Sequence, residues 1–251
     1  MTSATPSQGS TQPTEPAGLD KSGRTIRVMF AGVAPRYDLL NHVLSGGLDL
    51  VWRRRAAALL SAAERERVLD LCCGTGDQAK ALAARGAKVQ AADFCVPMLA
   101  RAQPKLAPAD GTPATGLAAA DALSLPYADR SFSAATVAFG LRNVADLDGS
   151  LTELRRALRP GGRLLVLEFA VPEAPLLRGP YLLYFRHVLP KIGALLSPRG
   201  SAYGYLTDSV LEFPQRRGFL DRMAAAGLTD LTYENLTGGI VCLYSGRRPR
   251  E

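Results

Sequence analysis

The feature that most constrains this chain is a glycine-rich stretch that follows a short apolar run. Val68-Leu69 leads into Asp70-Leu-Cys-Cys-Gly74-Thr75-Gly76-Asp77, and an Ala/Leu-rich segment comes next. This order predicts a strand, a tight turn and a helix. Glycine has no Cβ, so the backbone can approach a ligand closely. The free N–H groups of the helix that follows then point toward that ligand. The stretch therefore predicts a ligand-binding loop.

The charges of the loop constrain its ligand. Asp70 and Asp77 stand at its two ends, and they disfavour a phosphate, because like charges would face each other where a dinucleotide places its pyrophosphate. Acids there suit a ligand that carries an amino group or a sulfonium. A bare strand–turn–helix connection without a ligand is the alternative for so short a motif.

The rest of the chain alternates between strand and helix patterns. Strands are predicted at 68–72, 88–93, 115–120, 132–139 and 163–169. Helices are predicted at 77–85, from Pro97, and from an Asp146 cap to a stop at Pro160-Gly161-Gly162. Before the first strand, Asp49 is predicted to cap a helix that runs through Val51, Trp52 and Leu59. The alternation indicates a doubly wound α/β sheet with the glycine loop at the carboxyl end of its first strand.

The end of the chain departs from this pattern. A helix is predicted from Pro214, and the strands 228–236 and 240–245 then flank Thr237-Gly238-Gly239, which indicates an antiparallel hairpin. A nicotinamide-binding Rossmann domain ends in parallel strands. A Rossmann-like sheet that ends in an antiparallel hairpin resembles the class I methyltransferase fold.

Length and local composition define the domain organisation. A chain of 251 residues fits one α/β domain with extensions. Residues 1–22 are mostly Ser, Thr, Gln, Pro and Gly, and we expect them to be disordered. A single domain spans 23–251, with a helical cap at 23–63. A helical and aromatic insertion at 172–213 is interpreted as an ordinary packed helix pair or as a lid for an apolar substrate.

The charge and the reactive residues exclude several classes of protein. The net charge of +7 permits an anionic partner, but the basic residues are scattered, which argues against nucleic acid. We expect the triplet Arg53-Arg54-Arg55 to be solvated. Four cysteines without a C-x-x-C pair and two histidines indicate reduced thiols in a cytoplasmic protein without a metal site. No run reaches the ~18 apolar residues of a membrane helix.

Acids after the next two strands complete a nucleoside site. Asp93 ends the second predicted strand, where an acid accepts hydrogen bonds from a ribose diol. Asp121 and Ala122 follow the third strand, where the carboxylate is suited to an adenine amino group. With the terminal hairpin, this set resembles the S-adenosylmethionine (SAM) methyltransferase pattern. The predicted cofactor contacts are Asp70, Gly74, Thr75, Gly76, Asp93, Asp121 and Ala122.

Two longer stretches carry a more specific signature. Residues 24–55 include Ala34-Pro-Arg-Tyr37-Asp38-Leu-Leu-Asn41 and Trp52-Arg53, and residues 139–169 include Phe139-Gly-Leu-Arg142-Asn143-Val and Leu167-Glu-Phe169. Both stretches resemble the signatures of the UbiE/MenG family, the C-methyltransferases of menaquinone and ubiquinone biosynthesis. The similarity runs from about Arg24 to the C-terminus.

The resemblance implies an activity and a set of residues. It implies transfer of a methyl group from SAM to a ring carbon of a demethylmenaquinol. Arg142 would then stabilise the phenolate and act through a water, and Asn143 would orient the hydroxyl; a structural ion pair is the alternative for Arg142. Tyr37 and Tyr203 are the expected substrate contacts, with Asp38 beside Tyr37 closing the site.

Several alternatives remain open. The substrate is a menaquinone precursor, a ubiquinone precursor or another small apolar molecule, and a non-catalytic scaffold in quinone synthesis is a further alternative. The quinol comes from a membrane, so we expect peripheral contact at its inner face. Arg178, Arg186, Lys191 and Arg199 would then lie near anionic headgroups. The extra helices cap the pocket or pair two copies into a homodimer.

Overall fold

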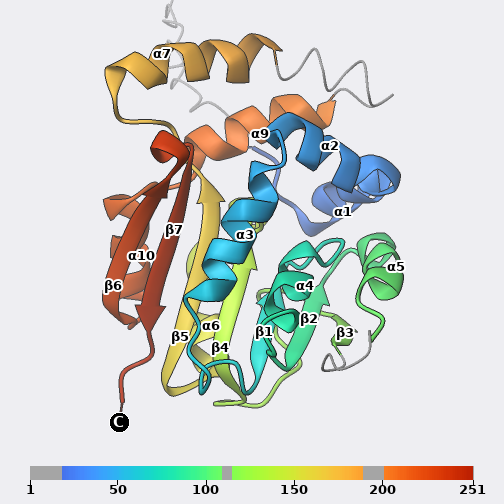
Figure 1. Cartoon of the computed structure of the whole chain (residues 1–251), viewed down its shortest axis with the longest axis vertical. Coiled ribbons are helices and arrows are strands. Elements are labelled where there is room, and N and C mark those ends of the chain that lie inside the picture. Colours follow the sequence, from blue (N-terminus) through green and yellow to red (C-terminus); the bar gives the residue numbers. More distant parts are fainter. Residues whose placement is uncertain (1–18, 109–114, 189–200, 251) are drawn as a thin grey trace, which may run out of the picture.

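A seven-stranded sheet forms the centre of the molecule (Figure 1). The computed structural model describes residues 19–108, 115–188 and 201–250, and the side chains of residues 201–203 are left out of the description. Residues 1–18 of the tail predicted at 1–22, and the basic residues Lys191 and Arg199, lie outside the described residues. The strands follow the order β3-β2-β1-β4-β5-β7-β6.

The first five strands are parallel, and the last two form the predicted antiparallel hairpin. β7 is inserted between β5 and β6 and runs antiparallel to both. The doubly wound α/β sheet with an antiparallel end is therefore confirmed. The strands are β1 (Val68–Leu71), β2 (Val89–Asp93), β3 (Gly116–Ala119), β4 (Phe132–Ala138), β5 (Leu158–Phe169), β6 (Thr229–Leu236) and β7 (Val241–Arg247).

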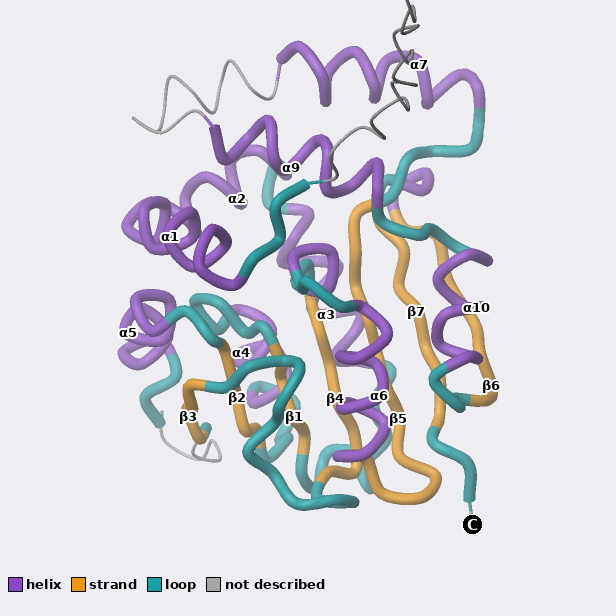
Figure 2. Tube along the Cα trace, turned by 180° about the vertical axis from the view of Figure 1, so that it is seen from behind, coloured by secondary structure: helices purple, strands orange, loops and turns teal. Residues whose placement is uncertain are grey.

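Helices cover both faces of the sheet. α3 (Leu48–Ala58), α4 (Asp77–Ala83) and α5 (Val96–Lys105) lie on one face. α6 (Leu147–Ala157) and α10 (Arg217–Ala225) lie on the other, as Figure 2 shows from behind. Strands covered on both faces are expected to be apolar throughout, and all residues of β1 and β4 are buried.

The remaining helices form a cap over the carboxyl ends of the parallel strands (Figures 1 and 2). No helix among the described residues is long and apolar enough to cross a membrane. The cap consists of α1 (Gly23–Val33), the 3-10 turn η1 (Ala34–Arg36), α2 (Tyr37–Ser45), α7 (Pro175–Leu183), the π-helical turn η3 (Tyr184–Val188) and α9 (Ser201–Glu212).

The local signals in the sequence were accurate at some boundaries and wrong at others. The predicted Asp146 cap is confirmed, because its carboxylate accepts a hydrogen bond from the Gly149 N–H at 3.0 Å. Asp49 does not cap α3; Gly47 does, with a left-handed φ of 78° that suits glycine. The strand β5 begins at Leu158, before the predicted Pro-Gly-Gly stop, because Leu158 pairs with Phe132 ahead of a bulge.

The helix predicted from Pro214 also begins later than expected. α10 starts at Arg217, because Arg216 has a φ of 51° and is not helical. The backbone N–H of Arg216 instead donates to the Tyr244 hydroxyl at 2.8 Å. This bond ties the start of α10 to the last strand.

Candidate functional site

Two cavities open at the carboxyl ends of the parallel strands, beneath the cap. The first has a volume of about 140 Å³ and is lined by the loops after β1, β2, β3 and β4. The second, of about 310 Å³, lies among the cap helices, α3 and the loop after β4. Five residues line both cavities and form a shared wall: Phe30, Tyr37, Arg53, Phe139 and Asn143.

The glycine loop is built around left-handed backbone positions. Gly74 and Gly76 have φ angles of 55° and 89°, and a Cβ on Gly76 would lie 2.8 Å from Leu106 Cδ1. Only glycine fits at residue 76 without displacing that side chain. Gly74 and Thr75 line the first cavity, and Gly76 caps α4 behind them. The structure thus places the predicted loop where a ligand can approach its backbone.

Asp93 joins the glycine loop to the end of β2. Its carboxylate accepts hydrogen bonds from the N–H groups of Gly74 and Cys95, both at 2.8 Å. Burial raises the pKa of this carboxyl, and the backbone donors oppose the rise. A carboxylate has about four acceptor positions, so Asp93, which lines the cavity, can still accept from a diol.

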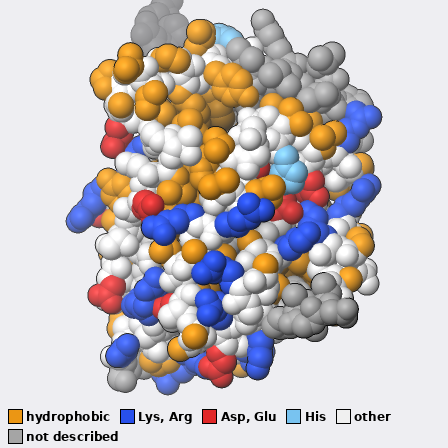
Figure 3. Space-filling model, in the orientation of Figure 1, with side chains coloured by type: hydrophobic (Ala, Val, Ile, Leu, Met, Phe, Trp, Pro, Cys, Tyr) orange, Lys and Arg blue, Asp and Glu red, His pale blue; other side chains and the backbone are white. Residues whose placement is uncertain are grey.

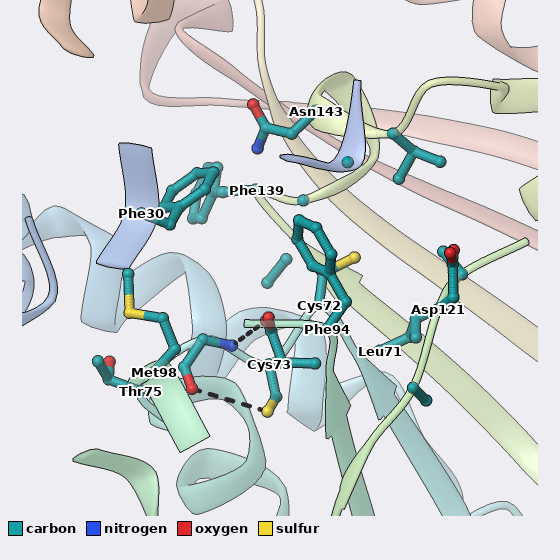
Figure 4. Close-up of a pocket in the computed structure, with 18 of the residues that line it drawn as sticks. Phe30, Leu71, Cys72, Cys73, Thr75, Phe94, Met98, Asp121, Phe139 and Asn143 are labelled. Carbon is teal, nitrogen blue, oxygen red and sulfur yellow. Dashed lines mark hydrogen bonds between the residues drawn. The ribbon is translucent and has the colours of Figure 1, made fainter. Parts of the chain in front are cut away.

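The loop after β3 forms the opposite side of the first cavity. In Figure 4, Thr75 and Met98 lie on one side and Asp121 on the other, with Phe94 between them. The Asp121 carboxylate accepts from the Leu123 N–H at 2.9 Å and is otherwise exposed. Ala122 lines the cavity beside it. An elongated ligand would therefore meet the glycine loop at one end and Asp121 at the other.

The structure places Asp70 behind the loop, not in the wall of either cavity. It is fully buried in β1 and accepts a hydrogen bond from the Thr136 hydroxyl of β4 at 2.9 Å. Burial raises the pKa of this carboxyl to about 7. Asp70 therefore links β1 to β4 beneath the loop.

Asp77 lines the first cavity, but a lysine neutralises it. The Lys105 ammonium lies 2.6 Å from the Asp77 carboxylate and 2.7 Å from that of Asp38. Asp38 also accepts a hydrogen bond from the Thr75 hydroxyl. Burial alone would raise the pKa of Asp38, but the Lys105 and Thr75 bonds lower it. This ionic cluster ties the cap helix α2 to the glycine loop.

His42 extends this ionic cluster on the cap side. Its Nδ1 lies 2.9 Å from the Asp49 carboxylate, and its Nε2 lies 3.8 Å from that of Asp77. Ligand atoms of these three side chains lie within 4.8 Å of one another, a grouping that could hold a metal ion. The Lys105 ammonium already brings a positive charge to Asp77.

Arg142 combines the two roles that the sequence left open. Its Nη1 lies 2.9 Å from the buried Glu168 carboxylate and donates to the Phe139 carbonyl at 2.6 Å, so the structural ion pair is present. The side chain also lines the second cavity, with Asn143 beside it. Arg142 Nε and Asn143 Oδ1 are buried without a hydrogen-bond partner among the described residues. Two polar atoms next to that cavity are thus left unpaired.

Arg53 is a site residue that the sequence interpretation missed. It was expected to be solvated, but only 7% of it is exposed, and its guanidinium lies 5.2 Å from the centre of the Phe139 ring. Ala56 and Ala57, three and four residues later, are buried against the sheet. That spacing puts Arg53 on the inner face of α3 and was the signal available in the sequence.

The predicted substrate residues have different outcomes. Tyr37 lines both cavities, and burial raises the pKa of its hydroxyl, against the charges of Arg142 and Arg53. Tyr203 lies in α9, and its side chain is outside the description. Tyr181 and Tyr205, which were not predicted as substrate contacts, line the second cavity.

Strained backbone lies where the two cavities meet. Phe139, at the end of β4, and Cys72, at the end of β1, have φ angles of 62° and 55°. Residues other than glycine rarely adopt a positive φ, and backbone strain of this kind is common at functional sites. A Cβ on Gly140 would clash with Cys72, so this glycine lets the two strand ends meet.

Comparison with known proteins gives consistent results. Residues 19–248 match the model of the ubiE/COQ5 methyltransferase family. A ubiquinone/menaquinone biosynthesis C-methyltransferase UbiE from Syntrophotalea carbinolica is 49% identical over 91% of this chain and 96% of its own length. A demethylmenaquinone methyltransferase from Thermus thermophilus is 49% identical over 88% of this chain and all of its own length.

Solved structures show the same fold at lower sequence identity. A SAM-dependent methyltransferase from Thermotoga maritima has a TM-score of 0.63 at 18% identity and covers 88% of this chain and 99% of its own. A phosphoethanolamine N-methyltransferase from Haemonchus contortus, in complex with SAM, has a TM-score of 0.57 at 16% identity and covers 92% of this chain and 59% of its own. The predicted class I methyltransferase fold is confirmed.

The raised pKa of Asp70 predicts a pH dependence of stability. In the unfolded chain this carboxyl titrates near its ordinary pKa of 3.8, and in the native protein near 7. Between these values the native state holds a proton that unfolding releases, so this group makes stability fall as pH rises. Asp70→Asn removes the effect while keeping an acceptor for Thr136. As pH rises through this window, the unfolding free energy of the variant minus that of the wild type should increase by up to about 1.4 kcal/mol per pH unit.

Urea unfolding at a series of pH values measures this difference. Asp129→Asn is the matched control, because Asp129 is an exposed acid outside both cavities. Its difference from the wild type should stay nearly constant over the same range. A constant difference for Asp70→Asn would show that the native carboxyl is already ionised.

Proposed function

The chain belongs to the ubiE/COQ5 methyltransferase family, and we propose that it transfers a methyl group from SAM to a ring carbon of a demethylmenaquinol. The observation that carries this proposal is the wall shared by the two cavities. A methyl donor in the first cavity and an aromatic acceptor in the second would meet at Phe139 and Asn143. Transfer requires such an alignment of acceptor carbon, methyl group and leaving group.

The residues of the first cavity fit SAM. The backbone of Gly74 and Thr75 can approach the methionine end, Asp93 can accept from the ribose hydroxyls, and Asp121 can accept from the adenine amino group. When bound there, SAM supplies an activated methyl group on a sulfonium. Lys105 pairs with Asp77 and Asp38, which holds the loop and the cap together around the cofactor.

The second cavity fits an apolar aromatic ring that carries hydroxyl groups. Its lining is mainly apolar and aromatic, and it includes Leu40, Trp52, Phe139, Phe169 and Phe185. Arg142 and Asn143 supply polar atoms within it. Ionisation of a quinol hydroxyl makes the neighbouring ring carbon nucleophilic. Arg142 would stabilise that phenolate, and Asn143 would orient the hydroxyl.

A ubiquinone precursor is the alternative substrate. One relative carries both quinones in its name, and another names demethylmenaquinone alone. Both precursors present a hydroxylated ring and an isoprenoid tail, so the chemistry proposed for Arg142 is the same for both.

Methylation of reduced demethylmenaquinone tests the proposal. The purified protein, given SAM labelled in its methyl group and substrate kept reduced without oxygen, should place the label on a ring carbon. The oxidised quinone should not react, because it has no hydroxyl to ionise. Label on oxygen, or no transfer, would contradict the proposal. Cells lacking the protein should accumulate a demethylated quinone.

Arg142→Lys tests the role of the arginine. Lysine keeps the charge that buried Glu168 requires, whereas alanine would leave that carboxylate uncompensated at a cost of about 3–5 kcal/mol. Lysine loses the planar guanidinium, so kcat with the quinol should fall on the order of 10-fold or more. The SAM Kd from calorimetry should stay the same. An unchanged kcat would show that Arg142 forms the ion pair with Glu168 and has no role in catalysis.

We also propose that the protein works in the cytoplasm and touches the inner face of the membrane through α7. No residue of this helix is buried as a whole, and its Leu176, Leu177 and Leu183 are 85%, 47% and 62% exposed. Hydrophobic side chains gather over the end of the molecule that carries α7, and Lys and Arg lie below them over α3 (Figure 3). Apolar side chains beside cations suit an anionic bilayer surface.

Sedimentation with lipid vesicles tests this contact. The protein should bind anionic vesicles. Changing both Leu176 and Leu177 to serine should weaken binding on the order of 10-fold, because neither side chain would then enter the apolar layer of the membrane. Val96→Ser is the matched control, since Val96 is 59% exposed on α5, outside the cap. Equal binding by all three proteins would exclude α7 as the contact.

A further inference from the structure

Two tyrosine hydroxyls in the second cavity are left without partners. Tyr181 on α7 and Tyr205 on α9 line this cavity. Their hydroxyl oxygens are buried and have no hydrogen-bond partner within residues 19–108, 115–188 and 204–250. Buried polar groups in proteins are normally paired, so each unpaired one calls for an explanation. The cavity they share is otherwise mainly apolar, which points to a ligand oxygen.

Tyr181 and Tyr205 line the same cavity as Arg142. The positive charge of Arg142 acts on Tyr181 and on Tyr205, and it lowers the pKa of both against the effect of burial. α9 also packs against the 3-10 turn η2 (Leu141–Asn143) that carries Arg142. α7, α9 and η2 therefore each bring an unpaired polar atom to residues that line this one cavity.

Both tyrosines are protonated donors at neutral pH. Burial raises the pKa of Tyr205 to about 12 and that of Tyr181 above its ordinary value. A quinol in the same cavity can therefore ionise while the tyrosines keep their protons. The charged and titratable groups that act on Tyr205 are Arg142, Glu212, Glu168 and Asp20, and those that act on Tyr181 are Arg142 and Tyr184.

We propose that Tyr181 and Tyr205 donate hydrogen bonds to the ionised ring oxygen of the quinol and form, with Arg142, an oxyanion site. The inference rests on the proposed function and assigns a catalytic role to α7 and α9, the two described α-helices of the insertion. Preorganised donors around developing negative charge are a strong source of transition-state stabilisation. Neutral phenols suit this task when they titrate well above the substrate.

The step balances with the two phenols unchanged. The quinol hydroxyl releases its proton to water, and the negative charge is held between the tyrosines and Arg142. The ring carbon next to that oxygen forms a bond to the methyl carbon as the bond from methyl to sulfur breaks, and that electron pair leaves on sulfur. Loss of the ring C–H proton to water restores the aromatic ring.

Phenylalanine substitutions test the donors, since they remove only the oxygen atom. Tyr181→Phe and Tyr205→Phe should each lower kcat on the order of 10-fold near neutral pH. The rising limb of kcat against pH should move to higher pH, because the bound quinol ionises less readily. Tyr233→Phe is the matched control, because Tyr233 is 39% exposed on β6 and lies outside both cavities. Wild-type kcat and pH profile in both variants would overturn the inference.

Binding of 1-naphthol separates this inference from the proposed function. This phenol needs no cofactor and no methyl transfer, and its absorbance reports its ionisation. Its pKa on the wild-type protein should lie below its value in water. The pKa of the bound naphthol should rise by about one unit in Tyr181→Phe or Tyr205→Phe, the equivalent of a tenfold change. It should stay at the wild-type value in Tyr233→Phe.

The two measurements distinguish the outcomes. The naphthol response without quinol methylation would support the oxyanion site and reject the proposed substrate. Methylation with no response of the naphthol pKa, or no binding of naphthol by the wild type, would overturn the oxyanion site alone. Calorimetry with SAM checks that each variant is folded, because its affinity should equal that of the wild type.

Discussion

The meeting of the ends of β1 and β4 is the constraint on which the site depends. The strand order reverses there, so the connections leave in opposite directions and a crevice opens at the carboxyl edge. Gly140 allows Cys72 to approach, and Phe139 is forced into a left-handed conformation. Both cavities use Phe139 as a wall. The donor and acceptor spaces are adjacent because these two strands are.

The charges around this crevice are arranged in two different ways. On the cofactor side the acids are compensated: Asp93 by backbone N–H groups, and Asp77 by Lys105. On the acceptor side Arg142 is held by Glu168, but polar atoms of Arg142, Asn143, Tyr181 and Tyr205 have no partner among the described residues. Compensated charge fixes geometry, whereas unpaired buried polar atoms are available to a ligand. This contrast explains why the second cavity suits a hydroxylated ring.

Patterns within single elements could be read from the sequence. Apolar runs predicted the strands, Asp146 predicted a helix cap, and Thr237-Gly238-Gly239 predicted the terminal hairpin. Each of these features depends on residues that are close together in the chain. The same reasoning was wrong for Asp49 and for the start of α10, where a left-handed Gly47 and the Tyr244 hydroxyl decide the boundary. Arg53 was wrongly expected to be solvated, because its position in a charged triplet does not show that α3 packs this side chain against the sheet.

The sequence by itself determined the sheet, the glycine loop and, by its resemblance to a family, the methyl donor and the class of acceptor. These follow from local periodicity and from motifs that are contiguous in the chain. Only the tertiary structure showed that Lys105 neutralises Asp77, that Asp70 lies behind the loop, and that Tyr181 and Tyr205 line the same cavity as Arg142. Those pairings join residues that are far apart in the chain, and packing alone brings them together.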